Sequence, residues 1–200
     1  MIKLITKYIT IFLLTLTFSA SASADQLEDL KELIEVKVET IISILKNDTI
    51  SRVEQDKHIY ENAEGLFDYT LMSRLSVGKK NWAKLDSTQK QEFIRLFSTL
   101  MKESYSEKAH MLSDEIVTVN DAQQIKKSRI YVSVSIKGSK EATELIYKFY
   151  YSKKGLWLVY DVDIAGVSIL QTYRAQFAET LKSDDMVVLM EKLKSSISTH

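Results

Sequence analysis

Apolar residues in the first half of the chain recur at steps of three and four, the spacing of one face of an α-helix. This pattern predicts one amphipathic helix over residues 27–45 and a second over 57–74, with Gly78 marking its exit. Asp86-Ser87-Thr88-Gln89 fits a capping box, in which a carboxylate and the side chain three residues later satisfy free backbone N–H groups. A third helix is therefore predicted to begin at this box, with an apolar stripe behind it.

The apolar period changes to two after residue 113. Apolar and polar residues alternate over 130–136, and two further apolar runs cover 145–151 and 156–164. Residues 116–119 are a candidate for a fourth strand. Because the connections between these runs are short, the strands are predicted to pair antiparallel.

Helical spacing returns at Val167 and continues to residue 181, and a terminal helix is predicted from residue 184. The order is therefore helices, a meander of strands, and helices again. We predict an α+β fold in which N-terminal and C-terminal helices pack against a curved antiparallel sheet of about four strands.

The first 24 residues have the anatomy of a secretory signal peptide. Lys3 and Lys7 precede a short apolar stretch, and Ala22-Ser23-Ala24 supplies the small side chains of a cleavage site before Asp25. The alternative is an uncleaved membrane anchor, which the short apolar stretch disfavours. The chain has no cysteine, so the cleavage site offers no residue for lipidation. We therefore expect an exported, periplasmic protein with a single domain over residues 25–200.

The charge balance argues against nucleic-acid binding, and the length fits a single domain. Without Lys3 and Lys7 the chain carries 25 basic and 27 acidic side chains, a net charge of −2. Such a balance gives no electrostatic reason to bind nucleic acid, which is recognised through clustered Lys and Arg. The remaining 176 residues are enough for one domain with a substantial core.

Asp161 and Asp163 are the best candidates for catalysis. Strict alternation along the last predicted strand places both side chains on one face, together with Trp157 and Val159. Two carboxylates in such positions suit acid–base chemistry or a cation. We favour a structural interpretation, in which they accept backbone N–H bonds or pair with a basic residue such as Arg174.

Other chemistry is not indicated. His58, His110 and His200 have no second ligand at a metal-binding spacing, and Ser168 fits a helix-start hydroxyl better than a nucleophile. The chain contains no nucleophile elbow, phosphate loop or dinucleotide fingerprint. We therefore predict no enzyme, no metal and no cofactor.

Bulky side chains occur on both faces of the predicted strands. Either helices or a second subunit cover the second face, or the protein holds a cavity for an apolar ligand. The residues concerned are Tyr131, Tyr147, Phe149, Tyr150, Tyr151, Trp157 and Tyr160.

The chain resembles the MlaC family of periplasmic phospholipid-binding proteins, also called the toluene-tolerance auxiliary family. The similar residues follow the family's order over essentially the whole chain after residue 24. They are Phe67-Asp68-Tyr69, Met72, Gly78, Trp82, Gln89, Phe93, Phe97, Leu100, Tyr105, Gly155-Leu156-Trp157-Leu158-Val159-Tyr160-Asp161-Val162, Gly166-Val167-Ser168 and Tyr173-Arg174-Ala175-Gln176-Phe177. The chain departs from the family at Ala165, where an acidic residue often precedes the glycine.

The resemblance implies a carrier that buries a phospholipid's acyl chains in an apolar pocket. A near-neutral single domain with a lipid-sized cavity is expected to be monomeric. The carrier's implied partners are an outer-membrane lipoprotein complex and an inner-membrane ABC transporter with an MCE-domain protein, which together maintain outer-membrane lipid asymmetry. The alternatives are an envelope enzyme that uses Asp161 or Asp163 and a ligand-free interaction module. On the carrier interpretation, the lipid-binding candidates are Tyr105, Val134, Ile136, Tyr147, Phe149, Trp157, Val167, Leu170 and Tyr173.

Overall fold

A computed structural model describes residues 18–111, 115–138, 142–183 and 185–197. Most of the predicted signal peptide lies outside these ranges, and the boundary before Asp25 stays a prediction. No helix within the described ranges is long and apolar enough to cross a membrane. The elements are α2 (Phe18–Leu45), α3 (Arg52–Ala63), α4 (Tyr69–Val77), α5 (Lys79–Trp82), α6 (Ser87–His110), β1 (Ile116–Lys126), β2 (Arg129–Lys137), β3 (Thr143–Tyr151), β4 (Trp157–Ile164), β5 (Val167–Ser168), α7 (Ile169–Ser183) and α8 (Met186–Ile197).

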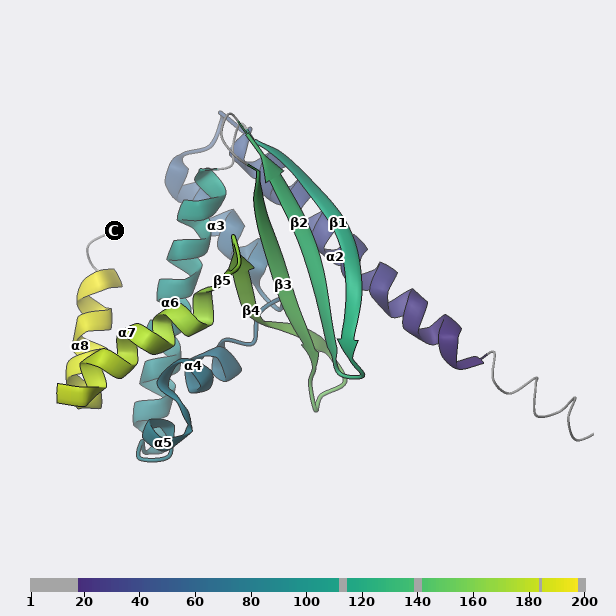
Figure 1. The fold of residues 1–200 in the computed structure, drawn as a ribbon. Helices are drawn as coiled ribbons and strands as arrows, with labels where there is room; N and C mark the ends of the chain where they lie inside the picture. The colour runs from purple at the N-terminus through teal and green to yellow at the C-terminus, as the bar shows by residue number, and fades with distance from the viewer. Residues whose placement is uncertain (1–17, 112–114, 139–141, 184, 198–200) are drawn as a thin grey trace, which may run out of the picture.

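The strands form one antiparallel sheet in the order β1-β2-β3-β4-β5, which confirms the α+β prediction with one strand more than expected. The long strands β1 and β2 curve past α2, while α6, α7 and α8 lie on the other side of the molecule (Figure 1). Leu30 and Ile34 of α2 are buried against Ile130 and Val132 of β2. A second apolar core joins α4, α6, α7 and α8 around Phe97.

The predicted helix over 57–74 is wrong, because the structure divides it into α3 and α4. Gly65 has a φ of 75°, which interrupts the helix, and the next residues run extended beside β4. The Val159 N–H donates to the Leu66 carbonyl at 2.8 Å, and the Asp68 N–H donates to the Val159 carbonyl at 2.9 Å. Periodicity missed this break because the apolar residues on either side of it keep helical spacing.

The capping box at the start of α6 is confirmed. The Gln89 N–H donates to Asp86 Oδ1 at 2.8 Å, and the Asp86 N–H donates to Gln89 Oε1 at 3.1 Å. A second capping box, between Ser51 and Glu54, begins α3 and was missed. Both boxes use the same local chemistry, so the sequence carried the signal for each.

A bulge in β4 overturns the predicted alternation of its side chains. Val159 pairs with Phe149 and Asp161 pairs with Lys148, so Tyr160 is the extra residue in this strand. Directly paired residues share a face, which places Val159 on the helix-covered face and Asp161 on the opposite one. The expectation that these two side chains share a face is therefore wrong.

The chain turns sharply after β4. Ala165 and Gly166 have φ values of 50° and 78° between the paired residues Ile164 and Val167, the pattern of a two-residue hairpin turn. The spacing predicted that Val167 begins a helix, but the structure places it in strand β5. Helix α7 begins two residues later.

Candidate functional site

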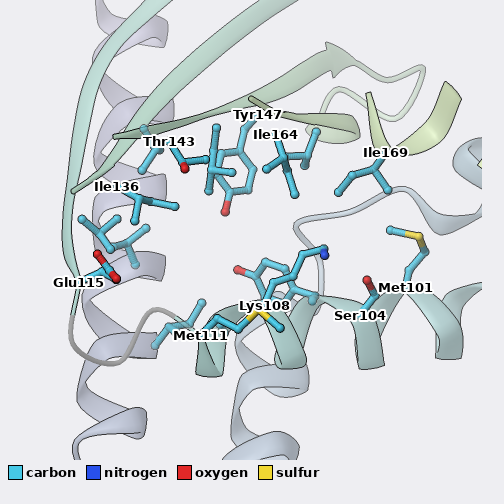
Figure 2. Close-up of a pocket in the computed structure, with 18 of the residues that line it drawn as sticks. Met101, Ser104, Lys108, Met111, Glu115, Ile136, Thr143, Tyr147, Ile164 and Ile169 are labelled. Atoms are coloured by element: carbon cyan, nitrogen blue, oxygen red, sulfur yellow. The ribbon is translucent and has the colours of Figure 1, made fainter. Parts of the chain in front are cut away.

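A cavity of about 500 Å³ lies between the sheet and helices α2 and α6. Side chains from both sides of this space point into it (Figure 2). Most of its wall is apolar, which suits a ligand with hydrocarbon chains. The aliphatic and methionine lining consists of Val38, Ile41, Ile42, Leu45, Met72, Met101, Ala109, Met111, Val117, Val134, Ile136, Leu145, Val162, Ile164 and Ile169.

The helical period of α2 and the two-residue period of the strands determine which side chains form the wall. On α2 the lining residues are Val38, Ile41, Ile42 and Leu45, spaced i, i+3, i+4 and i+7 along one helical face. On the strands, Val134 of β2 pairs directly with Leu145 of β3, so their side chains share the face that the helices cover. The N-terminal part of α2 packs tightly on the sheet, whereas its C-terminal part borders the cavity.

Four of the nine predicted lipid-binding residues lie on this wall: Tyr105 of α6, Val134 and Ile136 of β2, and Tyr147 of β3. They come from segments far apart in the sequence, and the sheet and α6 bring them together. Figure 2 shows Ile136 and Tyr147 on the sheet side of the cavity. Their contact with lipid stays a prediction.

The other five predicted residues lie outside the cavity wall. Phe149 shares the helix-covered face, but its end of the face is filled by α2, and it is fully buried. Leu170 and Tyr173 pack in the helical core, where the Tyr173 ring meets Phe97 edge-on. The two remaining residues are Trp157, which packs beside Tyr151, and Val167, which is 61% exposed.

Two phenols meet across the cavity. The Tyr147 ring on β3 projects into it (Figure 2), and its hydroxyl lies close enough to the Tyr105 hydroxyl on α6 for each phenol to influence the pKa of the other. Burial raises the pKa of both phenols, and that of Tyr105 stands well above its ordinary value of 10.0. Both phenols are therefore neutral at physiological pH, and the cavity receives no charge from them.

These shifts predict a loss of stability at alkaline pH. In the unfolded chain the phenols ionise near pH 10, whereas in the folded protein they ionise only at higher pH. From about pH 10 upward the unfolded state therefore binds fewer protons, and the free energy of unfolding falls by up to about 1.4 kcal/mol per pH unit for each phenol. Denaturant titrations between about pH 8 and pH 11 measure this slope. Tyr105→Phe is expected to make the slope shallower. An unchanged slope would contradict the raised pKa of Tyr105 in the folded protein.

The cavity also has lining residues that the sequence did not single out. Ile41, Ile42 and Leu45 belong to the stripe that predicted the first helix, so the helical period carried their signal without indicating a ligand. Lys108 and Glu115 line the cavity too, and nothing local marks them as site residues. Only the position of α6 across the cavity from the sheet identifies them.

Comparisons with known proteins assign the family. A family model described as "MlaC protein" matches residues 35–195 of the chain. The chain belongs to the MlaC family. A search of curated proteins found no match.

Seven chains from solved structures match this MlaC-family chain. One is described as the phospholipid-binding protein from Ralstonia solanacearum in complex with a phospholipid. It is 19% identical, with a TM-score of 0.70, and the match covers 84% of this chain and 97% of that chain. The two proteins therefore share their fold over nearly the whole of the Ralstonia chain.

In this MlaC-family member the carboxylates of β4 are occupied by structural contacts. Asp161 is only 4% exposed, and it accepts hydrogen bonds from Lys148 Nζ at 3.0 Å, Ser168 Oγ at 2.8 Å and the Leu170 N–H at 3.1 Å. Asp163 pairs with the same ammonium at 2.5 Å. The structural interpretation is thus confirmed for Asp161, although the basic partner is Lys148 rather than Arg174.

Ser168 and the histidines also make ordinary contacts. Ser168 Oγ accepts the Gln171 N–H at 3.0 Å, as expected of a helix-start hydroxyl. His110 ends α6 and contacts Asp56 of α3 at 2.9 Å, while His58 lies 3.2 Å from Glu61. His200 lies outside the described residues, and within the described ranges no three His, Cys, Asp or Glu side chains gather as metal ligands would.

Proposed function

We propose that this MlaC-family protein is a periplasmic carrier that binds a phospholipid by burying its acyl chains in the cavity between the sheet, α2 and α6. The observation that carries the proposal is an apolar cavity of about 500 Å³ inside a single α+β unit. The phospholipid named in the description of the Ralstonia structure, which has the same fold, supports it. A ligand-free interaction module with a filled core does not account for this cavity.

The energetics of transfer explain why a carrier needs an enclosed wall. Two acyl chains with about 30 methylenes lose on the order of 24 kcal/mol of apolar burial when they leave a bilayer, at about 0.8 kcal/mol each. A soluble carrier must restore nearly all of this burial. Several wall residues are only half-buried by the protein itself, among them Val38, Leu145 and Ile164. Acyl chains would cover them.

The cavity volume limits how much lipid fits without a change of shape. The space of about 500 Å³ is of ordinary size for a ligand pocket, which is about 300–1,000 Å³, and is not oversized for a lipid with two long acyl chains. We expect a two-chained lipid to widen the wall. The Tyr105–Tyr147 contact spans the cavity and is the interaction that a second chain would displace.

We further propose that the carrier works between the two partners implied by its family. These are an outer-membrane lipoprotein complex and an inner-membrane ABC transporter with an MCE-domain protein, and the exchange would maintain outer-membrane lipid asymmetry. The predicted signal peptide over residues 1–24 supports delivery to the periplasm, and the near-neutral single domain supports a monomer.

The decisive experiment is mass spectrometry of an organic extract. The chain is expressed with its own leader, purified from the periplasm without detergent and extracted, and the lipid is quantified against protein. We expect about one phospholipid per protein, because detergent-free purification offers the buried chains no alternative apolar phase. An extract without phospholipid would contradict the proposal. A mock purification from cells lacking the protein controls for carried-over membrane.

A further inference from the structure

Two charges lie on the otherwise neutral wall of the cavity. Among the described lining residues, Lys108 near the end of α6 and Glu115 just before β1 are the charged ones. Lys108 is exposed and Glu115 is half-buried, so both lie where the cavity meets solvent. Figure 2 shows Lys108 on the helix side of the cavity and Glu115 on the sheet side, below Ile136. The cavity wall therefore carries one positive and one negative group, on opposite sides of the cavity.

Neither group is engaged by another side chain in the described part of the chain. Lysines elsewhere do have partners: Lys102 pairs with Glu64, and Lys148 pairs with two carboxylates. Within the described ranges, Lys108 and Glu115 have no ion pair or hydrogen bond. Within those ranges, no other side chain competes with a ligand for either charge.

Gly138, at the end of β2, makes room for the Glu115 carboxylate. A Cβ placed on residue 138 would lie 1.3 Å from Glu115 Oε2, far inside van der Waals contact. The carboxylate therefore lies directly over the glycine, on the sheet side of the mouth. Any side chain at this position would displace it.

We propose that the mouth selects a zwitterionic phospholipid whose headgroup ends in a primary amine, with Lys108 binding the phosphate and Glu115 the ammonium. The inference rests on the proposed function, because the acyl chains must first enter the cavity. An ammonium donates charge-assisted hydrogen bonds to a carboxylate, whereas a quaternary choline has no N–H to donate. A glycerol headgroup has no positive charge for Glu115, so its lipid gains only the contact with Lys108.

The preference can be measured by competition. The protein, stripped of lipid, is incubated with vesicles of equal parts phosphatidylethanolamine, phosphatidylglycerol and phosphatidylcholine with identical acyl chains, and the bound lipids are quantified after separation. We expect phosphatidylethanolamine to be enriched about threefold over phosphatidylglycerol, the scale of one solvent-accessible ion pair. The enrichment should weaken at high salt, because exposed charges are screened.

Three variants test the assignment of each charge. Glu115→Gln should bring the bound ratio close to that of the vesicles. Gly138→Ala should move the ratio in the same direction but less far, because the added Cβ forces the flexible carboxylate aside without removing its charge. Lys108→Ala should lower the uptake of all three lipids, since each has a phosphate. Lys153→Ala and Glu32→Gln change exposed charges away from the cavity and should leave the ratio as in the wild type.

The outcomes separate this inference from the proposed function. A wild-type protein that takes up lipid in the ratio of the vesicles, or a Glu115→Gln variant that keeps the wild-type preference, would overturn the headgroup assignment and leave the carrier function standing. A protein that takes up no lipid of any headgroup would overturn the carrier function itself.

Discussion

Leu145→Asp is expected to abolish phospholipid retention while leaving the protein folded. Leu145 lies on the cavity wall and is only half-buried by the protein itself, so a carboxylate there remains hydrated until lipid enters. Acyl chains would then have to cover an unpaired charge at a cost of several kcal/mol, which corresponds to a loss of affinity of about 100-fold or more. The lipid content of the purified variant, measured by mass spectrometry, checks this result.

Ile146→Asp is the matched control. Ile146 is the next residue of β3 and is also half-buried, but its side chain lies on the opposite face of the sheet, two residues from Lys148. The same substitution there leaves the cavity wall unchanged, so this variant should retain lipid as the wild type does. Circular dichroism should show that both variants are folded. Equal lipid content in both would contradict the proposed location of the acyl chains.

The largest effect on stability is expected from Asp161→Ala. The carboxylate joins three elements, since it accepts hydrogen bonds from Lys148 on β3, Ser168 on β5 and the Leu170 N–H at the start of α7. Its removal leaves a buried N–H without a partner and weakens a buried ion pair. We expect the free energy of unfolding to fall by about 3–5 kcal/mol, the usual cost of breaking such a pair. Denaturant titration measures the change.

Asp163→Asn separates the role of Asp161 from a general effect of lost charge. Among the described residues, the polar partner of Asp163 is the shared Lys148 ammonium, whereas Asp161 also holds the start of α7. This variant should therefore lose much less stability than Asp161→Ala. Neither carboxylate borders the cavity, so the folded fraction of each variant should still bind lipid. A comparable loss of stability in both variants would show that the ion pair, rather than the α7 contact, dominates.

Much of the fold could be predicted from the sequence because its signals are local. The capping box at Asp86 and Gln89 needs only four residues, and the alternation over 130–136 needs only seven. Turn residues such as Gly78, which ends α4 with a φ of 83°, act through their own backbone freedom. Such features are determined by short segments and do not depend on what packs against them.

The tertiary structure decided which side chains meet the helices and where a cavity remains between the helices and the sheet. Residues 66–68 leave helical geometry because their backbone pairs with β4, and the bulge at Tyr160 changes which β4 side chains meet the helices. Phe149 and Tyr147 lie on the same face of β3. Helix α2 packs against the sheet at Phe149 but leaves a cavity at Tyr147.

The sequence by itself therefore determined the order of helices and strands and which of their faces are apolar, because periodicity records burial. It did not determine whether that burial is against other side chains or around a cavity, because that depends on where α2 and α6 lie across the sheet. The positions of Lys108 and Glu115 were likewise undetermined, because only the packed structure places both on the wall of one cavity.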